Sequence, residues 1–194
     1  MGVKRVLPTL ILVVLLVGYS LLSAKLQQAL PGFSPIPALF FCVAACLAWK
    51  WLGTIFAAWL IAYPLTNWIY GYGWNWQVLL TIAGFGLAVA VGASLRGSQR
   101  VPMLLAGSVG AAILFYVLSN TGSWLLLPDY PKNWTGFVQA QWTGAPHHAL
   151  DTWVFLRNGI LAHVLFTGLF LLGHRQWGGD SIRVGEPAPV RIRR

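Results

Sequence analysis

Acidic side chains are scarce in this sequence. Asp and Glu together account for 4 of its 194 residues, and charged residues of both signs make up 9% of the chain, whereas a soluble domain averages about 25%. Apolar residues take their place, and the mean hydropathy is +0.67. This composition excludes a water-soluble fold and is typical of one membrane domain with room for about five to seven helices.

The few carboxylates are also poorly positioned for chemistry inside a membrane. All of them fall in predicted loops or in the C-terminal tail, so none stands in an apolar run to carry a proton across a bilayer. The sequence also lacks a nucleotide-binding loop, a GxSxG elbow and an HExxH helix. We therefore expect no enzymatic activity, no catalytic residue, no metal and no cofactor. The acidic residues are Asp129, Asp151, Asp180 and Glu186.

Cysteine is nearly missing too. Cys42 and Cys46 lie four residues apart in one apolar run, which argues against a disulfide framework. The two thiols would share one helix face and could bind a soft metal or a haem-like ligand, but small apolar filler is the simpler interpretation.

The apolar runs predict six membrane-spanning helices. The first run follows Lys4 and Arg5 and is about as long as a full span, so we interpret it as an uncleaved helix and not as a signal peptide. Residues 120–152 are too polar to cross a membrane and are predicted to form a long outer loop, and residues 174–194 a basic cytoplasmic tail. The fold class is thus an all-α integral membrane protein with a six-transmembrane-helix bundle. The predicted helices cover residues 6–24, 37–49, 52–70, 77–94, 103–119 and 153–173.

The basic residues indicate the orientation of these helices. The net charge is +9, but Lys and Arg lie between and after the apolar runs, where they act as topology signals and not as a nucleic-acid surface. With the N-terminus inside, ten of the thirteen fall on the cytoplasmic side. Both termini are therefore predicted to be cytoplasmic. The three outer exceptions are Lys25, Lys132 and Arg157.

Polar residues inside spans and aromatic residues in the outer loops are the candidate ligand contacts. Polar groups within a bilayer are functional candidates by default, and here they lie mostly near the outer helix ends. We expect them to form one extracytoplasmic pocket for a small, partly planar ligand. Interfacial anchoring is the alternative for each Trp, and capping of loop carbonyls is the alternative for Arg157 and Asn158. The candidates are Asn67, Trp74, Trp76, Asn120, Trp124, Trp134, Arg157, Asn158 and His163.

Two further patterns are weaker. His147, His148 and Asp151, with His163 as a further candidate, could ligate a metal, but no spacing forces them to converge. Such a site would support a membrane enzyme as a third alternative. Small residues recur every four positions at Gly84, Ala88 and Gly92. This spacing lets helices approach closely, and packing within the bundle is favoured over a partner subunit.

Three segments carry a resemblance to known proteins: GFSPIPALFF, SNTGSWLLLPDYPKNWTGFVQAQ and FLRNGILAHVLFTGLFLLG. They resemble an uncharacterised family of bacterial six-helix membrane proteins, which in turn resembles the substrate-binding S components of energy-coupling-factor (ECF) transporters. The resemblance runs from about Phe33 to Gly173. Its most specific parts are the Asn-Thr-Gly-x-Trp turn that ends at Trp124, the Tyr-Pro-Lys at Lys132, and the Phe-x-Arg-Asn at Asn158.

The resemblance implies an S-component-like fold in a bacterial inner membrane. It implies capture of a vitamin-like or cofactor-like solute from the outer side, and a separate coupling protein with ATPases as the partner. Asn67 and His163 stand where the family commonly has acids, and the small-residue docking motif is represented only by Ser20 and Ala24 in the first helix. The alternative is a non-catalytic accessory subunit of a larger membrane complex.

Overall fold

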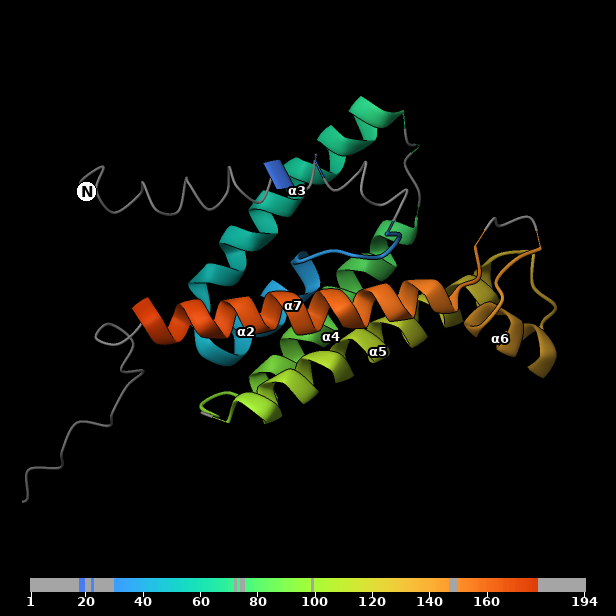
Figure 1. The fold of residues 1–194 in the computed structure, drawn as a ribbon. Helices are drawn as coiled ribbons and strands as arrows, with labels where there is room; N and C mark the ends of the chain where they lie inside the picture. The colour runs from blue at the N-terminus through green and yellow to red at the C-terminus, as the bar shows by residue number, and fades with distance from the viewer. Residues whose placement is uncertain are drawn as a thin grey trace, which may run out of the picture.

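The described part of the chain is entirely helical apart from its turns and loops. A computed structural model describes residues 18–19, 22, 30–71, 73, 76–98, 100–146 and 150–177, and none of them forms a strand. The predicted all-α class is therefore confirmed for these residues. Most of the helix predicted over residues 6–24, and the tail beyond residue 177, lie outside them. The helices are α2 (Ile36–Cys46), α3 (Lys50–Tyr70), α4 (Gln77–Ser94), α5 (Val101–Leu126), α6 (Trp134–Gln141) and α7 (Trp153–Trp177) (Figure 1).

Four of these helices are long and apolar enough to cross a membrane. They are α3, α4, α5 and the Trp153–His174 part of α7, with mean hydropathies between 1.3 and 2.1. Only 22–28% of each span is buried inside the protein, so most of the apolar surface points outward, as a bilayer-embedded helix requires.

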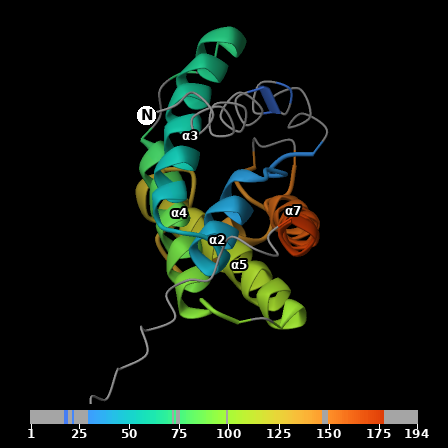
Figure 2. The same cartoon turned by 90° about the vertical axis from the view of Figure 1, so that its left-hand side faces the viewer.

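The short helix α2 occupies the centre of the bundle. Its 11 residues span about 16 Å at 1.5 Å per residue, roughly half the 30 Å of a bilayer core. Eight of them are buried, and α3, α4, α5 and α7 surround it (Figure 2). Because almost every side of α2 contacts protein, its sequence is apolar all round.

Arg96 explains why α2 stops earlier than the predicted end at residue 49. Its guanidinium reaches back from the turn after α4 and donates to the carbonyls of Ala44 (3.0 Å) and Leu47 (2.8 Å). The same group lies 5.2 Å above the ring of Trp49 in the α2–α3 turn. These bonds replace the next turn of helix, and α3 then begins at Lys50, two residues before the predicted start.

Close contact of α4 with its neighbours depends on glycine. A Cβ on Gly92 would lie 2.4 Å from the carbonyl oxygen of Phe41 in α2, and a Cβ on Gly84 would lie 2.0 Å from the ring of Phe115 in α5. Ala88 between them is buried. The small-residue spacing in this helix therefore serves packing within the bundle, as predicted, and the predicted bounds of α4 match the structure.

The segment predicted as one outer loop, residues 120–152, holds more helix than expected. Helix α5 continues from residue 119 to Leu126, where Pro128 disfavours a further turn. Helix α6 then begins after Asn133, whose side-chain oxygen accepts from the N–H of Gly136 at 2.9 Å. This asparagine cap is the local signal that the prediction of a loop overlooked. At the other end, α7 runs four residues beyond the predicted end at residue 173.

Helix α3 stands apart from the other long helices. It rises away from the layer of α4, α5 and α7 (Figures 1 and 2) and packs mainly on α2. Large aromatic rings connect α3 to α4 and α2. Trp59 of α3 meets Phe85 of α4 edge-on at 5.2 Å, and Phe85 stacks on Phe40 of α2 at 4.6 Å.

Candidate functional site

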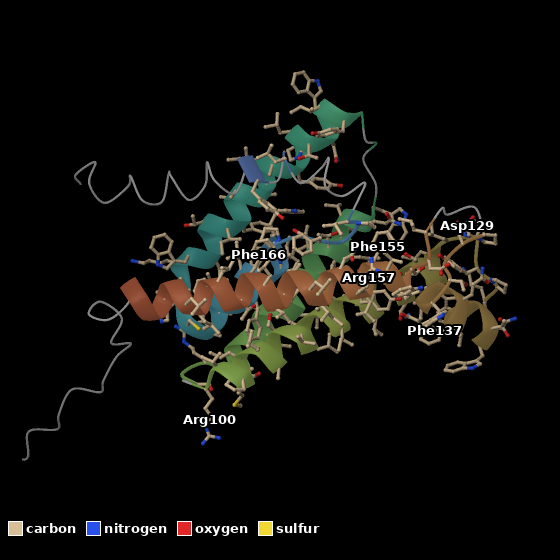
Figure 3. The ribbon with its side chains drawn as sticks, in the orientation of Figure 1. Arg100, Asp129, Phe137, Phe155, Arg157 and Phe166 are labelled. Atoms are coloured by element: carbon tan, nitrogen blue, oxygen red, sulfur yellow. The ribbon has the colours of Figure 1, made fainter. Side chains whose placement is uncertain are left out.

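Eight of the nine predicted contact residues lie in the described part of the chain. Asn67 is on α3, Trp76 precedes α4, Asn120 and Trp124 are on α5, Trp134 is on α6, and Arg157, Asn158 and His163 are on α7. Trp74 lies outside the described residues. The α5 and α6 members lie towards one end of the bundle, and Arg157 extends this group along α7 (Figure 3).

Asn158 holds an irregular stretch of backbone against α7. It is completely buried, its amide nitrogen donates to the carbonyl of Pro31 at 2.9 Å, and its amide oxygen accepts from Nε of Arg157 at 3.2 Å. Gly32 in this stretch has φ +80°, and a Cβ there would lie 3.3 Å from the carbonyl of Phe155. Both ends of the Asn158 amide are therefore used to fix the segment that leads into α2.

Arg157 is fixed by aromatic neighbours. Its guanidinium carbon lies 5.4 Å above the ring of Trp153, whose indole N–H donates to a carboxylate oxygen of Asp151 at 3.2 Å. Trp142 stacks on Trp153, with ring centroids 6.4 Å apart. The Arg157 guanidinium is thus held against Trp153 at the start of α7. The side chain is exposed there.

Asn67 is the predicted contact residue whose amide nitrogen has no hydrogen-bond acceptor among the described residues. The side chain is 8% exposed although the next residue, Trp68, is 81% exposed. Its amide nitrogen is buried, and no described residue accepts a hydrogen bond from it. A buried donor that has no partner costs about 1–3 kcal/mol, so an acceptor at this position would be stabilising.

An aromatic row leads along α3 to this amide. Phe56 stacks near Trp59 at 5.7 Å, and Trp59 lies 5.3 Å from Tyr63. Asn67 follows Tyr63 by four residues and therefore continues the same helix face. The face thus carries aromatic rings, of which Trp59 is buried in the core, and one polar group near the C-terminal end of α3.

His163 belongs to a different cluster, deeper in the bundle. Its Nδ1 lies 2.9 Å from the hydroxyl of Ser108, which lies 2.7 Å from the hydroxyl of Thr167. The Cys42 thiol donates to the same Thr167 oxygen at 3.6 Å. All four side chains are buried, and they join α2, α5 and α7 by polar contacts.

Sequence reasoning missed Ser108 and Thr167, because single hydroxyls are common in apolar helices. The one usable signal was that Thr167 follows His163 by four residues and so shares its face. Cys42 is buried in the apolar core, in agreement with the filler interpretation, although its thiol also donates. Among the described residues no three His, Cys, Asp or Glu side chains could hold a metal, and His147 and His148 lie outside these residues.

The motif residues Trp124 and Lys132 each donate hydrogen bonds to backbone carbonyls near the other residue. The indole N–H of Trp124 donates to the carbonyl of Pro131 at 2.9 Å, and the Lys132 ammonium donates to the carbonyls of Trp124 and Leu127. These bonds cap the C-terminal end of α5. The distinctive turn sequences at this end therefore have a structural role in joining α5 to α6.

Aromatic packing and amide bonds complete the α5–α6 junction. The Phe137 ring meets Trp124 edge-on at 5.4 Å and stacks on Trp134 at 5.3 Å. Trp134 is nevertheless 75% exposed. Asn120 donates to the carbonyl of Tyr116 in its own helix at 3.0 Å, and the Tyr116 hydroxyl donates to the carbonyl of Gln141. The Asn120 amide nitrogen is thus already bonded, whereas that of Asn67 has no acceptor in the described part of the chain.

Comparison with known proteins agrees with the uncharacterised family expected from the sequence. No curated protein and no solved structure matches the chain. One family model matches residues 4–178, which is most of the sequence, and its description is Family of unknown function (DUF6580). The chain therefore belongs to the DUF6580 family.

Proposed function

We propose that this protein is the membrane-embedded solute-binding component of an uptake transporter, with its pocket open to the extracytoplasmic side. The observation that carries the proposal is the Asn67 amide, a buried donor in an apolar helix with no acceptor among the described residues. Polar groups in a bilayer that are not used for structure are candidates for ligand contact. A solute carbonyl or ring nitrogen would remove the cost of leaving this donor unbonded.

The interrupted crossing at α2 supports the same function. Helix α2 is too short to span a bilayer, and residues 31–35 before it are not helical. Non-helical backbone at membrane depth is tolerated where protein buries it or where it lines a cavity, and transporters often bind substrates beside interrupted helices. Asn158 would hold this segment in position, and Arg157 would supply further donors at the outer end.

The proposed topology has six spans and cytoplasmic termini in a bacterial inner membrane, in an S-component-like arrangement. It counts the helix predicted over residues 6–24 and the short α2 with the four long helices. Lys50, Arg96 and Arg100 lie in or beside the α2–α3 and α4–α5 turns, which meet through the bonds from Arg96 to α2. A shared basic end supports assigning both turns to the cytoplasm.

The proposed partner is a coupling protein with ATPases, because the sequence has no nucleotide-binding loop of its own. The chain would bind solute and catalyse nothing. The ligand class is a vitamin-like or cofactor-like solute with planar groups that can stack beside the α3 aromatic row. Of the nine candidate residues, Asn67 is the proposed first contact and Asn158 the residue that positions the backbone. Asn120 and His163 already bond within the bundle and are not proposed as contacts.

Ligand binding to the purified full chain in mild detergent tests this proposal. Labelled vitamins and corrinoids would be screened by equilibrium dialysis, and we expect one class to bind saturably. Asn67→Ala should weaken that binding about tenfold, the effect of losing roughly 1.4 kcal/mol. Asn120→Ala removes an amide that is bonded within its own helix and is the matched control.

Saturable binding that Asn67→Ala leaves unchanged would contradict the role of Asn67. A complete failure of the screen, together with no ATPase in material purified from the native membrane, would contradict the transport proposal.

An accessory subunit of a larger membrane complex is the second candidate. Exposed tryptophans favour it, since Trp68 and Trp134 present most of their surface outside the bundle and Trp is enriched in protein interfaces. Gentle extraction followed by mass spectrometry of co-purifying proteins separates the two functions. An ATPase pair with a coupling subunit supports uptake, and a stable redox or secretion complex supports the accessory role.

A further inference from the structure

The short helix α6 exposes an apolar stripe on the side opposite its buried face. Trp134, Val138 and Trp142 are 75%, 44% and 60% exposed, and their four-residue spacing places them on one side of the helix. Gly136 and Ala140 are buried, and at 3.6 residues per turn their mean direction is about 180° from that of the exposed three. We call Trp134, Val138 and Trp142 the α6 stripe. The connection between α5 and α7 therefore presents an apolar surface that the described part of the chain leaves exposed.

Both indoles of the α6 stripe are held by other rings. Trp134 stacks on Phe137 of the same helix at 5.3 Å, and Trp142 stacks on Trp153 of α7 at 6.4 Å. The backbone N–H of Trp153 also donates to the carbonyl of Trp142 at 3.0 Å. The stripe is therefore fixed to the folded bundle, although most of its indole surface is exposed.

The length of α5 gives the depth of this end of the bundle. Its 26 residues extend about 39 Å at 1.5 Å per residue, more than the roughly 30 Å of a bilayer core but less than the 40–45 Å that includes both headgroup layers. Arg100, the residue before α5, is charged and exposed and so belongs in one headgroup layer. The opposite core boundary then falls near Thr121, about 30 Å along the helix. The last turn of α5 therefore lies among headgroups.

Two hydrogen bonds place the end of α6 beside this boundary. The Tyr116 hydroxyl donates to the carbonyl of Gln141, and the Gln141 amide nitrogen donates to the Thr121 hydroxyl at 3.2 Å. The middle of α6 lies further out, since Phe137 contacts Trp124 near the end of α5. Helix α6 therefore packs back along the last turns of α5, from the headgroup layer to the core boundary (Figure 1).

A bilayer fits the α6 stripe better than a second protein does. Trp is enriched at this depth, because its ring can contact acyl chains while its N–H meets the headgroups. With about 150–250 Å² for a buried aromatic side chain, the stripe presents on the order of 400 Å², roughly half of what each partner contributes to a standard protein interface. The polar side chain of Gln141 is bonded to α5, so the exposed side stays apolar.

We propose that α6 is an interfacial helix, seated between the headgroups and acyl chains of the leaflet at this end of the bundle, with the α6 stripe in contact with phospholipid. Helices with one apolar exposed side lie in the plane of a membrane at this depth. Part of the connection predicted as a loop is then a membrane-embedded element. The inference is independent of the solute contact at Asn67 and of the transport function.

Spin labelling of the full chain in phosphatidylcholine vesicles tests which medium covers the α6 stripe. Val138→Cys would be labelled in a chain that also carries Cys42→Ala and Cys46→Ala. Molecular oxygen concentrates in the bilayer and a water-soluble nickel chelate stays outside it, so the ratio of their collision rates reports depth. Val117→Cys, at an exposed position of α5, is the lipid control. Asp129→Cys, at a charged position before α6, is the aqueous control.

The oxygen-to-nickel ratio at position 138 should be several-fold higher than at position 129 and lower than at position 117. A ratio equal to that at position 129 would place the stripe in water and overturn the proposal. A ratio as high as at position 117 would place α6 in the acyl-chain core and contradict the interfacial depth. Low collision rates with both reagents would show that protein covers the stripe, as a second copy or another subunit, and would also overturn it.

A label-free measurement keeps the test decisive if the cysteine-free chain does not fold. The tryptophan emission of the wild-type chain and of Trp134→Phe/Trp142→Phe would be compared in vesicles whose lipids carry bromine near the headgroup, and again with acrylamide in the water. The emission that the two substitutions remove should be quenched more strongly by bromine than by acrylamide. The reverse order of quenching would contradict contact between the α6 stripe and lipid.

Discussion

Asn158 donates a 2.9 Å hydrogen bond to the carbonyl of Pro31, across 127 positions of sequence. This bond connects the start of α7 to the non-helical segment that leads into the central helix. An asparagine amide suits the position because it donates to one backbone carbonyl and accepts from the neighbouring arginine with the same planar group.

Replacing Asn158 should release that segment. Asn158→Leu keeps similar volume but loses both hydrogen bonds and leaves the Pro31 carbonyl without its partner, so we expect about 1–3 kcal/mol lower stability. Hydrogen–deuterium exchange should rise in residues 32–38 and remain unchanged in α5. Asn120→Leu is the control, and equal exchange in residues 32–38 of the two variants would contradict the proposed role of Asn158.

Ser108 should couple three helices energetically. Ser108→Ala removes the bonds to His163 and Thr167, and we expect a loss of about 1–2 kcal/mol in detergent unfolding measurements. Ser94→Ala, whose hydroxyl bonds only to its own helix, should change stability much less. In a double-mutant cycle with Thr167→Val the two effects should be less than additive, and full additivity would argue against a shared network.

Gly136 should tolerate no side chain. A Cβ at this position would lie 1.9 Å from the carbonyl oxygen of Pro131, whereas a Cβ on Gly86 would have nothing within 4 Å. Gly136→Ala should therefore disrupt the α5–α6 junction and speed its proteolysis. Gly86→Ala should instead stabilise α4 by about 0.5–1 kcal/mol, the usual gain from glycine to alanine within a helix. Similar proteolysis of the two variants would be inconsistent with this packing.

The junction should also weaken in alkali. Burial raises the pKa of Tyr130 above its ordinary value near 10, because the ionised phenol loses its hydration. The stabilisation from keeping this phenol neutral is complete below about pH 10 and is lost as the pH rises through the higher folded value. Absorbance titration near 295 nm should show that Tyr130→Phe removes a tyrosine with a midpoint above 10. Removal of one at or below 10 would contradict the burial.

Much of the helical architecture follows from simple patterns in the sequence. Residues 77–94 were predicted with the bounds that the structure has, because polar residues and glycine flank a continuous apolar run. The end of α5 was misplaced because Asn120 looked like the start of a loop, whereas its amide bonds back to Tyr116 within the helix. A polar residue that bonds to its own helix does not end that helix, but Pro128 does.

The candidate site was less accessible to sequence reasoning. Asn67 and Asn158 look alike in sequence, as single amides near helix ends, yet one amide nitrogen is unbonded among the described residues and the other is fully used. That difference depends on segments more than one hundred residues apart, which local patterns do not report. The termination of α2 by Arg96 was missed because it too depends on a distant segment, about 50 positions away.

The central position of α2 also bears on how the chain assembles during synthesis. A helix with eight of its 11 residues buried offers lipid little surface, and its length is insufficient to cross the bilayer alone. Its neighbours α4, α5 and α7 are all made after it, and Arg96, which bonds its last carbonyls, emerges about 50 residues later. We therefore expect α2 to take its final position only after these later segments have been made.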